Sequence, residues 1–179
     1  MKPVNGSCEL TLTGNERFFK DSEIIVSKTD LKGHITYAND VFLHIAGYTE
    51  QETIGKPHSI IRHPAMPRAV FKLLWDTISS GNEIFAYVIN RAKNGDHYWV
   101  MAHVTPSYDP SGKMIAYHSS RRVPDRKIVE GTIIPLYQML QDEENKHNNR
   151  KDGMNASVGL LLEILSGRNI TYDEFILTL

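Results

Sequence analysis

The fold is decided by Asn90-Arg-Ala-Lys-Asn-Gly-Asp-His-Tyr-Trp99. Its apolar and aromatic flanks meet at Asn94-Gly95, the strongest short-range signal for a tight turn between paired strands. A second stretch, Ile60-Ile-Arg-His-Pro-Ala-Met-Pro67, has two prolines that a regular helix or strand would not tolerate. We therefore expect a hairpin and an ordered cationic loop that leads into a helix. A sheet facing such a loop suggests a domain that senses small molecules.

Working outward from the hairpin, the sequence predicts five antiparallel strands in one sheet, with helices covering a single face. A capped helix is expected at 40–46, since Asn39 can accept a backbone N–H at its start. A longer helix is expected between Pro67 and Ser79 from its apolar spacing. The fold class is therefore α+β. The expected strands lie at 23–28, 34–37, 84–92, 97–107 and 113–122.

The pattern changes after Pro124. Apolar residues between Ile133 and Leu140 recur at helical spacing. Residues 142–155 have no apolar periodicity and are predicted to form a linker or a frayed helix. Residues 156–166 carry more apolar side chains than one helix face can bury, so this part needs a partner surface on its own domain or on another chain. The predicted organisation is a lead-in (1–21), a sensor domain (22–124) and a C-terminal helical extension (125–179).

Composition limits the function classes. The 179 residues carry a formal net charge of -1, and the basic spots at Arg62 and Arg68 and at Arg121–Lys127 are interpreted as solvated faces, so no nucleic-acid footprint is expected. The single cysteine, Cys8, excludes a disulfide or a thiolate zinc site within one chain. No apolar run approaches the roughly 20 residues that cross a bilayer. We expect a cytoplasmic protein without direct membrane insertion.

Several motifs carry a family resemblance. Thr36-Tyr-Ala-Asn-Asp40, Ala46-Gly-Tyr-Thr49, Ile54-Gly-Lys-Pro-His58, the Arg-His-Pro loop and Lys93-Asn-Gly-Asp-His-Tyr-Trp-Val100 resemble the flavin-binding PAS domain of aerotaxis and energy-taxis transducers. The resemblance covers about residues 22–124. It implies a PAS fold that holds FAD non-covalently and reports its redox state to a chemotaxis transducer. Since long heptad-patterned helices are missing, the chain resembles the stand-alone PAS partners of a separate transducer, with a homodimer expected.

The resemblance also implies cofactor residues. Asn90 offers a donor and an acceptor for the edge of the flavin ring. Arg62 and His63 suit the diphosphate, because a guanidinium pairs bidentately with phosphate oxygens, and His58 would lie on the same loop. Asn39 either contacts the cofactor, caps its helix, or does both.

Three further residues are candidates with an open alternative. Trp75 either packs at the core or rim or stacks on the ring. Trp99 and its neighbour Tyr98 point to opposite faces of the sheet, so only one of them can line the pocket. Ser120 is placed near the position where light-sensing flavin PAS domains have a glutamine beside the redox nitrogen, which suggests a signal-transmission contact.

Two alternatives to flavin sensing remain. The family usually has Asp where this chain has Ala65 and Trp where it has Ile84, so the chain could be a PAS interaction module with another small ligand or an empty pocket. A haem-based gas sensor would need one axial histidine from a set that forms no close metal motif: His44, His97, His103 and His118.

Catalysis is not expected. No Ser-His-Asp spacing, phosphate-cradling glycine loop or kinase or cyclase signature stands out in the sequence. The sequence therefore predicts a binding protein, not an enzyme.

Overall fold

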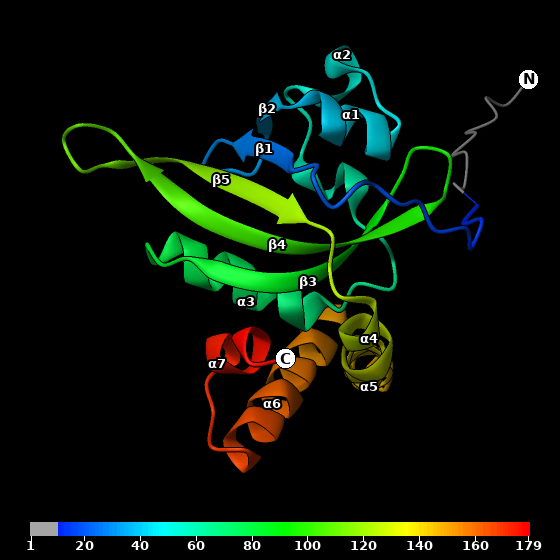
Figure 1. Cartoon of the computed structure of the whole chain (residues 1–179). Helices are drawn as coiled ribbons and strands as arrows, with labels where there is room; N and C mark the ends of the chain where they lie inside the picture. The colour runs from blue at the N-terminus through cyan, green and yellow to red at the C-terminus, as the bar shows by residue number, and fades with distance from the viewer. Residues whose placement is uncertain (1–10) are drawn as a thin grey trace, which may run out of the picture.

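The computed structural model describes residues 11–179 and contains one five-stranded antiparallel sheet in the order β2-β1-β5-β4-β3 (Figure 1). The predicted α+β class and strand number are confirmed. Each strand lies within two residues of its predicted position, because turns and apolar alternation both mark its ends. The strands are β1 (Ile25–Thr29), β2 (Ile35–Ala38), β3 (Ile84–Arg91), β4 (His97–Tyr108) and β5 (Met114–Arg122).

The lead-in, described from residue 11 onward, packs against the β3–β4 hairpin. At the turn, Gly95 has a φ of 95°, and a Cβ there would lie 2.1 Å from the backbone oxygen of Thr11. Arg17 Nε donates to Asp96 Oδ2 at 2.8 Å, and Asp96 Oδ1 accepts from Thr13 at 2.6 Å. Residues 11–21 therefore run as irregular chain along the start of β4. Residues 1–10, Cys8 among them, lie outside the described part.

Four helices of the sensor domain lie between β2 and β3 in the sequence. They are α1 (Asp40–Ala46), α2 (Glu50–Thr53), the 3₁₀ helix η1 (His58–Ile61) and α3 (Arg68–Ser79). The Asn39 side chain caps α1 by accepting from Phe42 N at 3.0 Å. The buried residues of α3 follow the predicted helical spacing and pack on the inner face of the sheet.

The C-terminal extension folds back on its own domain. Figure 1 shows its helices gathered at the β3 side of the molecule, next to α3. The Tyr137 hydroxyl donates to the backbone oxygen of Tyr87 on β3, and its ring lies 6.0 Å from the ring of Trp99 on β4. The extension thus covers part of the outer face of the sheet. Its elements are α4 (Arg126–Ile128), the π-helical turn η2 (Val129–Ile133), α5 (Ile134–Asn145), α6 (Arg150–Gly167) and α7 (Tyr172–Leu177).

Of the two alternatives predicted for 142–155, a linker or a frayed helix, the linker is wrong for most of the range: only residues 146–149 separate α5 from α6. Asn149 begins α6 by accepting from the backbone nitrogens of Lys151 and Asp152. At the crossing of α5 and α6, a Cβ on Gly153 would lie 2.4 Å from the backbone oxygen of Glu144. The two helices approach closely because Gly153 has no side chain, not because an apolar stripe holds them together. Apolar periodicity therefore did not reveal the helical residues in this range.

Candidate functional site

A cavity lies between the inner face of the sheet and the helices η1 and α3. The strands contribute every second residue to it, as expected for one face of a sheet. Val88 and Asn90 come from β3, Ala102 and Val104 from β4, and Tyr117, Ser119 and Arg121 from β5. The other side is lined by Ile61, Phe71, Leu74, Trp75 and Ile78, and the ends by Ser27, Thr29, His58, Arg62 and His118.

Three buried polar atoms in this lining have no hydrogen-bond partner among the described residues: Asn90 Nδ2, Ser119 Oγ and Arg121 Nη1. A buried donor without a partner costs about 1–3 kcal/mol, so native structures rarely keep several together. All three line one cavity whose surface is mostly apolar. This arrangement fits a flat apolar ligand with hydrogen-bonding edges, and a flavin ring meets that description.

The charged end of the cavity is a buried cluster of Arg121, His58 and Ser27. Arg121 Nη2 donates to His58 Nε2 at 2.7 Å and to Ser27 Oγ at 3.0 Å. Burial, followed by the charge of Arg121, lowers the pKa of His58 to about 3, and burial also lowers the pKa of Arg121 to about 10. His58 is therefore neutral at neutral pH and accepts the guanidinium N–H, leaving Arg121 Nη1 to face a ligand.

The mouth of the cavity is closed by Trp75. Its ring meets the edge of Tyr117 at 5.7 Å, and a Cβ on Gly33 would come within 2.8 Å of it. The cavity holds about 70 Å³, whereas ligand pockets usually measure about 300–1,000 Å³. A flavin ring therefore fits the chemistry of the lining but enters only if side chains at the mouth move. Trp75 is 36% exposed, so part of its ring faces solvent.

Arg62 joins this cavity to a second, polar hollow of about 430 Å³ between the Arg-His-Pro loop and the extension. Its guanidinium lies 4.2 Å from the centre of the Phe71 ring, and Nη2 donates to Met66 O at 3.3 Å. An isolated antiparallel bridge pairs the backbone of Arg62 with that of Asn90. Two predicted cofactor residues are therefore directly connected.

His63 lines the polar hollow, not the cavity. Its Nδ1 accepts from Ala65 N at 3.1 Å, and its ring lies 5.7 Å from the ring of His97. Burial, with further contributions from His97 and Arg91, lowers its pKa to about 4. His63 is therefore neutral at neutral pH and contributes hydrogen bonding, not charge.

Three of the predicted site residues line neither the cavity nor the polar hollow. The amide of Asn39 accepts from Val26 N and Phe42 N and donates to Ile24 O, and Asn39 does not line the cavity, so the capping alternative holds. Trp99 lies on the outer face against the extension. Ser120 alternates with Ser119 on β5 and points away from the cavity.

Sequence reasoning missed Ser119, Arg121 and Ser27. Arg121 was interpreted as part of a solvated basic face, but it is 4% exposed. Strand alternation was the available signal: once Asn90 is placed inward, the cross-strand register fixes which residues of β5 share its face. Arg121 and His58 are 63 positions apart in the sequence, so no local sequence pattern predicts their contact.

Among residues 11–179, no cluster of three or more metal-ligating side chains occurs. Of the histidines considered for haem, His118 lines the cavity. Within the same described range, no helix is long and apolar enough to span a membrane.

This fold, with a cavity between sheet and helices, is that of the PAS family, and residues 35–121 belong to it: they match the family model described as "PAS fold". The chain is 45% identical over 121 residues to the "Aerotaxis receptor" of Escherichia coli strain K12, covering 67% of this chain and 23% of that protein. It is 26% identical over 103 residues to the "Nitrogen fixation regulatory protein" of Klebsiella pneumoniae, covering 58% and 21%.

The chain thus carries a PAS domain like that of the aerotaxis receptor but spans about a quarter of the length of these relatives. Both names describe sensing or regulation, in agreement with the expectation that the domain is not an enzyme. Solved structures share the fold. The structure titled "The light state structure of the blue-light photoreceptor Aureochrome1 LOV" superposes with a TM-score of 0.54 at 22% identity, covering 66% of this chain and 91% of that one.

Proposed function

We propose that this protein is a cytoplasmic redox sensor that binds FAD non-covalently and signals to a chemotaxis transducer by protein contact, as a homodimer. The observation that carries the proposal is the set of unpaired buried atoms of Asn90, Ser119 and Arg121 in an apolar cavity. The similarity to an aerotaxis receptor supports a signalling partner of that class.

When bound, a flavin supplies reversible electron transfer coupled to protonation at its ring. The amide of Asn90 and the guanidinium of Arg121 would hold the polar edge of the ring, and Phe71 and Trp75 would pack against its apolar surface. A change in hydrogen bonding at Asn90 would reach Arg62 through the backbone bridge that joins them.

The test begins with an absorption spectrum of the freshly purified chain, followed by heat release and chromatography of any bound compound. Released FAD would support the proposal. Arg62→Ala should lower flavin retention, whereas the exposed Arg122→Ala should not. Full occupancy of Arg62→Ala would remove Arg62 from the site.

A second function, a PAS interaction module without flavin, is favoured by the small cavity and by Ala65 and Ile84. A colourless protein that does not take up added FAD would support this function instead. A Soret band in the same spectrum would indicate haem.

A further inference from the structure

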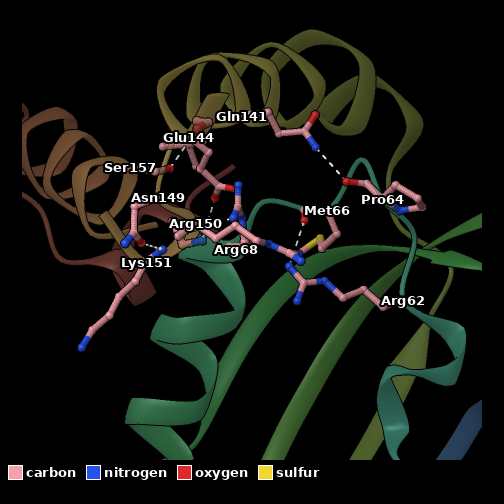
Figure 2. A network of polar contacts seen from close by, with 12 residues as sticks. Arg62, Pro64, Met66, Arg68, Gln141, Glu144, Asn149, Arg150, Lys151 and Ser157 are labelled. Atoms are coloured by element: carbon pink, nitrogen blue, oxygen red, sulfur yellow. Dashed lines mark hydrogen bonds and ion pairs between the residues drawn. The ribbon is translucent and has the colours of Figure 1, made fainter. Parts of the chain in front are cut away.

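The polar hollow lies where the sensor domain meets the extension. Figure 2 shows its residues gathered between α5 and the Arg-His-Pro loop. The sensor domain contributes Ser59, Arg62, His63, Pro64, Met66 and Arg68, and the extension contributes Gln141, Glu144, Asn145 and Arg150. Residues more than 70 positions apart in the sequence therefore form one space.

The hollow carries an excess of positive charge. Three guanidinium groups line it, from Arg62, Arg68 and Arg150, together with a single carboxylate, Glu144. Arg68 Nε is paired with Glu144 at 2.7 Å, so the charges of Arg62 and Arg150 have no carboxylate partner within salt-bridge distance among the described residues. Burial lowers the pKa of Arg62; the charge of Glu144 opposes this shift, and repulsion from Arg68 and Arg150 adds to it. A bound anion would relieve that repulsion.

The hollow and the cavity share one lining residue. Arg62 lines both spaces, with its side chain between the apolar ring of Phe71 and the hollow. A ligand with a flat ring in the cavity and a doubly charged diphosphate beside it would meet Arg62 at the point where the two parts join. Guanidinium groups are the side chains that best match phosphate oxygens.

We propose that the hollow is the subsite for the diphosphate of the ligand, and that Arg150 of the extension, together with Arg62 and Arg68, holds it. This proposal rests on the proposed flavin-binding function. In consequence, the extension completes the binding site, and its docking tightens when a diphosphate-containing flavin is bound. Arg150 stands at the first position of α6, so the ligand would hold this helix against the Arg-His-Pro loop.

The test compares two flavins on the full chain freed of bound flavin: FAD, which has a diphosphate, and riboflavin, which has none. Fluorescence titration gives each Kd. We expect Arg150→Ala to weaken FAD binding about tenfold, as for the loss of one charge-assisted contact, and to change riboflavin binding less than twofold. The matched control is Lys151→Ala, because Figure 2 shows Lys151 turned away from Arg62 and Arg68. It should change neither Kd.

Hydrogen exchange provides the second readout. FAD should slow amide exchange at residues 150–165 in the native chain and not in Arg150→Ala, and riboflavin should not slow it in either. Arg150 is exposed, so the variant is expected to keep the melting temperature of the native chain without ligand.

The outcomes separate the two proposals. If both flavins bind and Arg150→Ala weakens them equally, or weakens neither, the diphosphate subsite is overturned while flavin binding stands. If the native chain binds neither flavin, the proposed function is overturned and the subsite with it. Selective loss of FAD affinity supports both.

Discussion

The cavity and the junction with the extension treat their buried polar groups differently. In the cavity, Asn90, Ser119 and Arg121 keep donors without partners. At the junction with the extension, both oxygens of Glu144 are bonded, to Arg68 Nε at 2.7 Å and Ala69 N at 3.0 Å, and Ser157 donates to Leu140 O at 3.0 Å. The carboxylate of Glu144 and the hydroxyl of Ser157 are thus fully partnered, whereas three polar atoms of the cavity remain available to a ligand.

The largest effect should follow from breaking the junction at Glu144. Glu144→Ala leaves Arg68 and the start of α3 without their buried carboxylate, and we expect a loss of about 3 kcal/mol in the free energy of unfolding. Urea denaturation measures it. The neighbouring Glu143→Ala, which removes a surface pair with Lys146, should cost less than about 1 kcal/mol. Equal losses would contradict the structural role assigned to Glu144.

Two glycines of α6 test how closely the helices pack at the junction. Gly153→Ala would place a methyl group 2.4 Å from the backbone oxygen of Glu144, and we expect a loss of about 2 kcal/mol from overpacking. Gly159 has nothing within 4 Å of that position, so Gly159→Ala should gain up to about 1 kcal/mol through helix propensity. Melting curves of the two variants should shift in opposite directions.

The cavity side should respond to pH. The pKa of His58 is lowered to about 3 in the folded chain, whereas in the unfolded chain it is about 6.5. The unfolded chain thus binds a proton that the folded chain does not, and stability falls as the pH drops below about 6.5. Between pH 7 and pH 5 this loss amounts to at most about 2 kcal/mol.

The pH range above 5 separates this effect from the carboxylates with lowered pKa values, which titrate at lower pH. Urea denaturation at pH 7 and pH 5 should show a smaller difference for His58→Gln than for the native chain. The exposed His44→Gln should keep the native difference. An unchanged difference in His58→Gln would place the pH sensitivity elsewhere, and His63 is the next candidate.

The smallest effects come from two buried serines, one between α5 and α6 and one in the cavity. Ser157→Ala removes the hydrogen bond to Leu140 O and should cost about 1 kcal/mol. Ser119→Ala removes a hydroxyl without a partner and should be neutral or slightly stabilising in the absence of ligand. Similar losses of unfolding free energy in both variants would mean that the Ser119 hydroxyl has a hydrogen-bond partner in solution. It would then not be available to bind a ligand in the cavity.

Local chemistry in the sequence was enough to predict the sheet. Asn94-Gly95 marked the hairpin, Asn39 marked the start of α1, and the spacing of Val70 and Leu74 marked α3. These signals come from residues close in sequence, so a single chain contains them. They also placed Asn90 on the strand that lines the cavity.

Face assignment was harder, because a shift of one residue moves a strand side chain to the other face. Ser120 is predicted where Ser119 lines the cavity. The sequence names Trp99 as a candidate and leaves open whether it or Tyr98 faces the pocket. The structure turns Trp99 outward for a tertiary reason: it packs against Tyr137 of the extension, and no local signal shows that the extension lies there. The pairing of Arg121 with His58 was unpredictable for the same reason.

The positions of Trp75 and Trp99 have a practical consequence. They are the two tryptophans of the chain, one at the mouth of the cavity and one beneath the extension. Trp75→Phe leaves a single indole that reports on the extension, and Trp99→Phe leaves one that reports on the cavity. The intrinsic fluorescence of the two variants can therefore follow ligand entry and helix undocking separately, without an added dye.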